Sequence, residues 1–592
     1  MTMTPVANPG AVPPPPPPPS RTAPPPPPPR VAQRGKLGDL LVNAHLITSE
    51  QLADALTQQA ASGKRVGEVL VELGALSDED LSRVLAGQLG MPTVDLSQRA
   101  PSAEAVALLP ESVARSRMAV PLEIRPDGSL VIAAADPDPT LVATLAHATG
   151  RQVQVLVSPR NDVQRAIDAA YRALIGIERF VEAFEQSAAA GRRPQETLVQ
   201  GAVLEDDAPV VHVVNLIITQ ALRDRASDIH IEPRDDMVRV RYRIDGALHD
   251  AVSLPVHMSS AVVSRVKIMA DMNIVERRRP QDGQITMSVD GREIDLRVST
   301  VSTIWGEKCV MRVLDKSRSL FRMADLGMPT ASHELLTKLI HSPFGMVLCA
   351  GPTGAGKTTT LYAALNEIDE PHRNIMTIED PVEYVFPSIN QIQTNEQAGI
   401  TFADGLKSIL RQDPDVILVG EIRDVETARI AVQSALTGHF VLSSLHATDS
   451  AAALHRFLDM GIESFLIASS VVGVISQRLL RRICNRCRAP YKPTDEELAF
   501  YEGSGGEPKT EFTRGQGCNF CAGTGYQDRT GVFEVMKITP EIKRLIVGWA
   551  TQEEIQRMAV SQGMRTLQDE ANRLIANDVT TIAEVVRSIY AA

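Results

Sequence analysis

The sequence GPTGAGKT, residues 351–358, decides the fold of the largest part of this 592-residue chain. It follows the apolar residues 346–349 and precedes a segment with helical periodicity, the strand–loop–helix order of a phosphate-binding P-loop. Glycines let backbone amides turn toward a phosphate, and the helix N-terminus adds positive potential. We predict that Lys357 contacts the β- and γ-phosphates of ATP and that Thr358 binds Mg²⁺. The predicted nucleotide-binding residues are Gly351, Pro352, Thr353, Gly354, Ala355, Gly356, Lys357, Thr358 and Thr359.

Short apolar segments alternate with helical ones around this loop. The expected strands are residues 346–349, 375–378, 416–419 and 440–443. Such alternation predicts an α/β domain in which helices cover both faces of a parallel sheet.

Two carboxylates follow expected strands at the sheet edge where such folds bind ligands. TIEDPVE places Glu379 after residues 375–378, and ILVGEIRD places Glu421 after residues 416–419. Either carboxylate could orient the attacking water while the other holds Mg²⁺, and we assign Glu421 to the metal. The alternative is that both merely cap helices.

A histidine follows the next expected strand. TGHFVLSSLHATDS contains His439 before residues 440–443 and His446 after them. A single histidine is often structural, but His446 stands at a strand end where it can meet the γ-phosphate. We therefore count His446 with Glu379 and Glu421 as a catalytic candidate.

Four of the six cysteines form two CxxC pairs. Cys484, Cys487, Cys518 and Cys521 supply four thiolates, the ligand set of a closed, structural Zn²⁺ site. Neither pair opens a helix after a strand, which argues against redox catalysis. We predict a zinc knuckle over residues 484–521 and read Cys309 and Cys349 as core residues.

The beginning of the chain is rich in proline. Residues 13–19 and 24–29 are polyproline runs without amide donors, which predicts a disordered, extended tail over residues 1–33. Such a tail is a spacer, or a ligand for a profilin-like or SH3-like domain.

A repeat follows, in which residues 36–59 and 65–88 superimpose with an offset of 29. Thr48 and Ser77, each before acidic residues, are expected helix N-caps. Together with an expected strand at residues 129–134, the repeat predicts a small α/β module over residues 34–173. Residues 174–208, poor in apolar periodicity, are expected to be a linker.

A further domain is expected over residues 209–324. It begins with an amphipathic helix from residue 210 and continues with an alternating strand at residues 238–244. Asp245-Gly246 is an expected turn, and residues 325–592 then form the domain that carries the P-loop and the knuckle.

Composition limits the possible partners. Sixty basic and seventy-two acidic residues give a net charge of −12, which argues against nucleic acid as a direct partner. We see neither an apolar run of the roughly 18 residues that a membrane span needs nor a signal-peptide pattern. A cytoplasmic location is expected.

The motifs together resemble those of the secretion-superfamily ATPases that drive type IV pilus assembly and type II secretion. GPTGAGKT, TIEDPVE, ILVGEIRD and TGHFVLSSLHATDS resemble that family's Walker A, Asp, Walker B and His boxes. ASDIHIEP, RYRIDG, RRRPQDG, RVST and GEKCVMRVLD resemble its preceding domain, with Ser302 where the family usually has proline. The resemblance implies a PAS-like domain before a RecA-like ATPase domain.

The resemblance also implies a homo-hexamer that docks on an inner-membrane platform protein at the inner face of the membrane. Arginines of the preceding domain, matched here by Arg278, Arg297 and Arg312, would approach the nucleotide; surface salt bridges are the alternative. We expect pilus assembly, since assembly-type members often carry a tetracysteine knuckle. Type II secretion is the alternative, and a nucleic-acid translocase is a third reading.

The N-terminal repeat resembles the tandem cyclic di-GMP-binding module of some of these motors. The matching residues are Lys36, Gly38, Gln59, Arg65, Gly67 and Gln88. The family has arginine where this chain has Lys36, and an ammonium lacks the bidentate and stacking contacts of a guanidinium. The module therefore either binds cyclic di-GMP or serves only to dock a protein.

Overall fold

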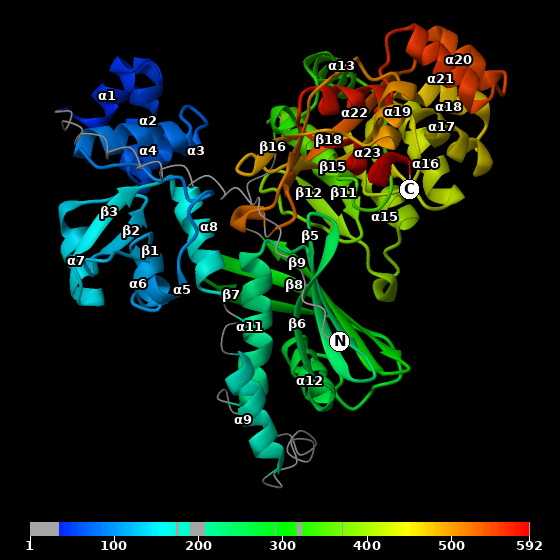
Figure 1. Ribbon diagram of the computed structural model, residues 1–592. Helices are drawn as coiled ribbons and strands as arrows, with labels where there is room; N and C mark the ends of the chain where they lie inside the picture. The colour runs from blue at the N-terminus through cyan, green and yellow to red at the C-terminus, as the bar shows by residue number, and fades with distance from the viewer. Residues whose placement is uncertain are drawn as a thin grey trace, which may run out of the picture. The chain divides into compact units, whose positions relative to one another are not determined.

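A computed structural model of the chain describes residues 35–172, 174, 177–189, 208–290, 292–315, 322–369, 371–521 and 523–590. The predicted tail over residues 1–33 lies outside this set. The chain divides into two compact units, one with the residues up to Asp95 and Ser102–Val163, the other with Leu96–Pro101 and Gln164–Ala592. Each unit has its own sheets, as Figure 1 shows.

The first unit begins with the duplication. Its four helices are α1 (Leu37–Asn43), α2 (Ser49–Ser62), α3 (Val66–Glu72) and α4 (Asp78–Leu89). The hydroxyl of Thr48 accepts a hydrogen bond from an amide of α2, and Ser77 does the same for α4, so both predicted N-caps are confirmed. The helices share one apolar cluster, which includes Leu41, Leu70 and Leu81.

A small sheet completes this unit. Its elements are α5 (Ala103–Val106), α6 (Glu111–Ser116), β1 (Ala119–Ile124), β2 (Leu130–Ala134), α7 (Pro139–Thr149) and β3 (Val153–Val157). Strand β2 is the predicted strand; it pairs antiparallel with β1 and parallel with β3. The helix α8 (Arg160–Ala170) follows.

The predicted linker is wrong over part of its length. Residues Ile177–Ala189 form helix α9, which packs on α11 (Pro209–Arg223) through the ring of Phe180, stacked 4.9 Å from that of His212. Ile177 and Phe184 are buried in the same apolar cluster as α11. Apolar residues at positions 177, 180, 181 and 184 have helical spacing, a signal that the surrounding Ala, Glu and Gln obscured.

The second unit contains a six-stranded antiparallel sheet. Its strands are β4 (Asp228–Pro233), β5 (Met237–Ile244), β6 (Ala247–Pro255), β7 (Gln281–Val289), β8 (Arg292–Thr303) and β9 (Gly306–Asp315), in the order β6-β5-β4-β9-β8-β7. Helices α11 and α12 (Ser259–Met269) share its apolar cluster. Asp245 and Gly246 have φ of 47° and 84°, as the predicted hairpin turn between β5 and β6 requires.

A seven-stranded sheet carries the P-loop. Its strands are β10 (Gly345–Ala350), β11 (Ile375–Glu379), β12 (Asn390–Gln393), β13 (Val416–Val419), β14 (Phe440–Leu445), β15 (Val471–Ile483) and β18 (Tyr526–Lys537), in the order β12-β11-β13-β14-β10-β15-β18. All four predicted strands are confirmed, and β18 alone of the seven runs antiparallel to its neighbour. Strand β14 lies between the P-loop strand and β13, the RecA-like order.

Helices cover both faces of this sheet (Figure 1). They are α13 (Thr330–Ile340), α14 (Lys357–Ile368), α15 (Phe402–Ile409), α16 (Val425–Leu436), α17 (Ser450–Asp459), α18 (Ser464–Ser470), α20 (Pro540–Val547) and α21 (Gln552–Ser561). Alternate residues of β10 enter two apolar clusters: Val347 packs with α13 and α14, and Leu348 with α16 and α17. The sheet is therefore buried on both sides.

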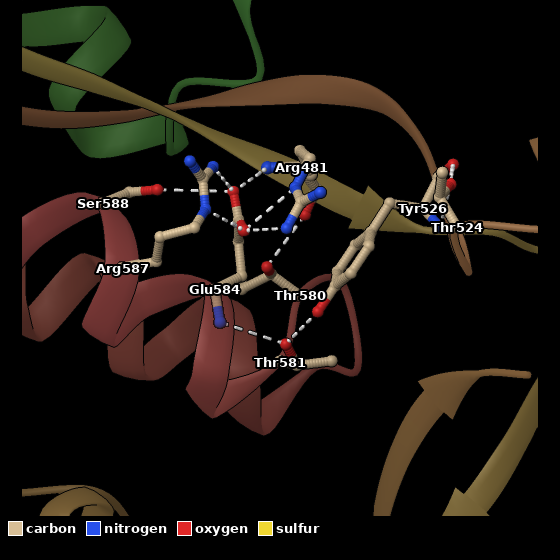
Figure 2. Close-up of polar contacts among 8 residues, drawn as sticks. All are labelled: Arg481, Thr524, Tyr526, Thr580, Thr581, Glu584, Arg587 and Ser588. Carbon is tan, nitrogen blue, oxygen red and sulfur yellow. Dashed lines mark hydrogen bonds and ion pairs between the residues drawn. The ribbon is translucent and has the colours of Figure 1, made fainter. Parts of the chain in front are cut away.

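The remaining elements form a lobe at the tip of the β15–β18 hairpin. They are β16 (Arg488–Tyr491), α19 (Asp495–Gly503), β17 (Phe512–Gly515), α22 (Leu567–Ala576), α23 (Ile582–Val585) and a final π-turn, Val586–Tyr590. Figure 2 shows that Arg481 and Arg587 both bond the buried carboxylate of Glu584. The hydroxyls of Tyr526 and Thr581 are hydrogen-bonded at 2.6 Å. Among the described residues, no helix is both long and apolar enough to cross a membrane.

Candidate functional site

The P-loop turns sharply between β10 and α14. Gly351 has a φ of 154°, and a β-carbon there would lie 2.7 Å from the carbonyl oxygen of Gln477, so the loop passes too close to β15 for a side chain. Helix α14 begins at Lys357, and Thr358 in its first turn is exposed. The predicted phosphate-binding loop therefore ends at the N-terminus of α14, where the hydroxyl group of Thr358 is exposed.

The ammonium group of Lys357 lies over the loop. Its Nζ donates to the carbonyl oxygens of Gly351 at 2.8 Å and Pro352 at 3.1 Å. Burial lowers the pKa of Lys357, and the carboxylate of Glu421 opposes that shift. An ammonium that has only carbonyl partners here is available to a phosphate.

Glu421 and His446 meet at the same edge of the sheet. Glu421 follows β13, His446 follows β14, and their Oε2 and Nε2 atoms lie 3.7 Å apart. Arg423 also pairs with Glu421. Burial and then the charge of Lys357 lower the pKa of His446, so its imidazole is neutral at pH 7.

Glu379 has different surroundings. Its side chain is 3% exposed and accepts hydrogen bonds from the hydroxyl of Tyr362, from Thr377 Oγ1 at 2.6 Å and from Gln391 Nε2 at 3.2 Å. Burial raises the pKa of this carboxyl group. The two predicted carboxylates thus differ, because Glu379 is enclosed by donors whereas Glu421 faces Lys357 and His446.

Sequence reasoning missed two residues beside the P-loop, Gln477 and Arg478. Both are buried on β15, at 1% and 7% exposure. Their signal was the run of polar residues Ser476, Gln477 and Arg478 inside the otherwise apolar sequence VVGVISQRLL.

Two of the three predicted arginines lie together. Arg297 on β8 stands directly opposite Arg312 on β9. Arg312 Nε lies 3.1 Å from a carboxylate oxygen of Asp228, and Arg297 Nη2 donates to the carbonyl oxygen of Val382 at 3.2 Å. Arg278 lies apart from this pair, exposed in the loop between α12 and β7.

The four knuckle cysteines converge. Their Sγ atoms all lie within 4.8 Å of one another, and Cys484–Cys518, Cys487–Cys521 and Cys518–Cys521 are each 3.8 Å apart. Tetrahedral zinc with Zn–S bonds of about 2.3 Å places its sulfurs about 3.8 Å apart, so these residues fit that ion. Hydrogen bonds from Cys484 and from the amides of Cys518 and Gly525 lower the pKa of Cys521, which favours a thiolate.

The matching residues of the N-terminal repeat occupy equivalent positions. Lys36 and Arg65 immediately precede α1 and α3, while Gln59 and Gln88 lie near the ends of α2 and α4. A β-carbon at Gly38 or Gly67 would lie 2.9 Å from Cδ1 of Leu52 or Leu81, respectively. These glycines therefore let paired helices pack closely. Arg65 pairs with Asp136, and Gln88 Nε2 donates to the carbonyl oxygen of Gly35 at 2.9 Å.

Curated relatives resemble almost the whole chain. The type IV pilus assembly ATPase PilB of Myxococcus xanthus is 40% identical over 557 residues, 93% of this chain and 98% of its own. Type II secretion system protein E of Xanthomonas campestris is 39% identical over 562 residues, again 93% and 98%. A solved structure, the pilus retraction motor PilT with bound ADP, is 24% identical over 63% of this chain and 95% of its own, with a TM-score of 0.43.

Two family descriptions match the sequence. Residues 89–176 match "MshEN domain", which begins where the duplication ends. Residues 203–587 match "Type II/IV secretion system protein", which is more than half of the chain. The chain therefore belongs to the type II/IV secretion system protein family and is an ATPase of that family.

Proposed function

We propose that this chain is a motor ATPase that hydrolyses ATP at the P-loop to power assembly of a type IV pilus. The observation that carries this proposal is the convergence of Lys357, Glu421 and His446 at the carboxyl ends of β10, β13 and β14. Phosphoryl transfer depends mainly on positioning and on electrostatic stabilisation, and these three groups supply both.

The residues divide the work as follows. The loop amides and Lys357 bind the β- and γ-phosphates, and Thr358 and Glu421 would hold Mg²⁺, which prefers oxygen ligands. When bound, Mg²⁺ neutralises charge on the phosphates. We assign to Glu421 both its place at the metal and the orientation of the attacking water, and His446 would contact the γ-phosphate. Glu379 is the alternative base, since its raised pKa suits proton uptake.

The assembled motor would be a homo-hexamer on an inner-membrane platform protein. In such a ring, Arg297 and Arg312 would present two adjacent guanidinium groups to a nucleotide, and Arg278 would approach it from an exposed loop. Zn²⁺ held by the four cysteines would have a structural role. The N-terminal module would bind cyclic di-GMP as a regulatory ligand.

Type II secretion is the second candidate function, because one relative from each system has nearly the same identity to this chain. Deletion of the gene, with both surface filaments and exported proteins scored, separates the two. Complementation with Lys357→Ala tests whether ATP hydrolysis is the activity required. If the deletion strain loses its surface filaments and exports proteins normally, the result supports pilus assembly. If it keeps its filaments and loses export, the result favours type II secretion.

A further inference from the structure

Strand β15 extends beyond the end of β10, where the P-loop begins. Ala350, the last residue of β10, pairs with Ser476, so Gln477 and Arg478 lie beside the start of the loop. Successive residues of a strand point to opposite faces of the sheet. Two consecutive buried polar side chains here can therefore reach different loops.

Gln477 supports the P-loop. Its Nε2 donates to the carbonyl oxygen of Ala355 at 2.6 Å, and its Oε1 accepts from the thiol of Cys349 at 3.3 Å. Both ends of the side-chain amide are thus satisfied inside the protein. The contact with Ala355 fixes the middle of the phosphate cradle.

Arg478 supports the loop that carries His446. Its Nη2 donates to the carbonyl oxygen of Thr448 at 2.8 Å, and its Nη1 donates to that of Gln477 at 3.0 Å. Among the described residues, the buried Nε finds no hydrogen-bond partner. Burial lowers the pKa of Arg478, and the charges of Asp449 and Glu534 oppose that shift. A buried guanidinium that joins β15, through Gln477, to the loop of His446, through Thr448, implies a positioning role.

We propose that Gln477 and Arg478 are positioning residues that divide the work of the nucleotide site. Gln477 fixes the P-loop and so supports nucleotide binding, whereas Arg478 fixes the loop of His446 and so supports turnover. The inference rests on the proposed ATP hydrolysis. It predicts that substitutions of two neighbouring residues affect different kinetic constants.

The test uses the full chain and two measurements, affinity for a non-hydrolysable ATP analogue and kcat for phosphate release. Arg478→Met lowers kcat at least about tenfold and changes the analogue Kd less than about threefold. Gln477→Leu raises that Kd at least about fivefold. Arg482→Met, which changes an exposed arginine of the same strand, leaves both constants as in the wild type.

A double-mutant cycle with His446→Ala tests the route of the effect. If Arg478 acts through the His446 loop, adding Arg478→Met to His446→Ala lowers kcat by less than about threefold further. A fully additive loss, or a wild-type kcat in either single variant, would overturn the assignment of Arg478, and an unchanged Kd in Gln477→Leu would overturn that of Gln477.

Two further variants keep the test decisive. If Arg478→Met does not fold, as judged by thermal melting, Arg478→Lys replaces it, because a single nitrogen on a shorter side chain does not reproduce the two-nitrogen fork that bonds Thr448 and Gln477; a wild-type kcat there also overturns the proposal. Lys357→Ala in the same assay reports on the proposed function itself. If that variant hydrolyses ATP like the wild type, the P-loop assignment fails, whatever the Arg478 variants show.

Discussion

His446 Nε2 lies 3.7 Å from Glu421 Oε2, although residues 420–439, with the whole of helix α16, separate the two strands that these residues follow. The parallel pairing of β13 and β14 brings the two strand ends together. A neutral imidazole can donate one hydrogen bond, either to this carboxylate or to a phosphate oxygen. A γ-phosphate and the carboxylate of Glu421 would therefore compete for the single hydrogen bond that His446 can donate.

Lys357→Ala is expected to lower ATP turnover by about a hundredfold or more, because the developing charge on the phosphates loses its nearest cation. The fold should persist, since Lys357 bonds only loop carbonyls. Phosphate release and thermal melting measure the two effects. Lys338→Ala, at an exposed lysine of α13, is the control; a native kcat in Lys357→Ala would contradict the P-loop assignment.

Glu421→Gln is expected to abolish turnover yet retain nucleotide, because the cradle persists while the water and the metal lose a carboxylate. Glu379→Gln is the paired variant, at a carboxyl group already enclosed by three donors. Phosphate release and binding of an ATP analogue are measured on both. Native turnover in Glu421→Gln would transfer the role of base to Glu379.

Purified protein is expected to contain about one zinc per chain, and chelation should lower the melting temperature, because metal affinity is coupled to folding of the knuckle. Cys518→Ser should lose the metal, whereas Cys309→Ala, at a buried cysteine of β9, should keep it. Elemental analysis decides the matter. Protein prepared without chelator that holds no zinc would refute the site.

Cyclic di-GMP is expected to bind the full chain, with Arg65→Ala weakening binding at least as much as Lys36→Ala, since a guanidinium can stack and bond in a bidentate manner. Calorimetry measures both affinities. Lys64→Ala is the control, at a neighbouring lysine that pairs with Glu72. Absence of heat and of competition at high micromolar ligand would leave the module as a docking domain.

Glu584→Gln is expected to destabilise the C-terminal lobe by about 3 kcal/mol at pH 7, because two arginines lose a buried anionic partner. Burial raises the pKa of Glu584, but hydrogen bonds from Arg587 and Arg481 outweigh it and hold the pKa below the ordinary 4.5. This stability is complete above pH 4.5 and is lost as the pH falls through the folded-state value.

Thermal melting of both proteins across pH 3 to 8 is the measurement, a range that runs from below to well above the ordinary carboxyl pKa. The difference between wild type and variant should shrink at the acidic end. A difference that stays constant with pH would show that the ion pairs in Figure 2 contribute nothing to it.

Local patterns predicted much of the fold. The strands around the P-loop and the caps Thr48 and Ser77 depend on residues close in sequence, and the structure confirms them. Helix α9 was missed because its apolar stripe lies within a polar, alanine-rich segment and becomes evident only against α11.

Part of the candidate site could be predicted, namely the ionisable residues that follow strand ends. Lys357, Glu421 and His446 belong to strand ends that the topology must bring together. Gln477 and Arg478 were missed, because their importance lies in bonds to Ala355 and Thr448, which are 122 and 30 residues distant in sequence, respectively. The hydrophobic periodicity of a sequence does not indicate hydrogen bonds between residues so far apart in the chain.

The knuckle is inserted between β15 and β18, two strands that remain paired up to the point of insertion. Ile483, the last residue of β15, pairs with Tyr526, the first residue of β18, so excision of the residues between them leaves two strand ends that a short turn could join. Yet Tyr501 and Phe512 of the insertion share one apolar cluster with Leu574 and Ile582. Excision would expose the C-terminal helices to water. The insertion and these helices therefore form one exchangeable cassette, which evolution or an engineer must gain or lose as a whole.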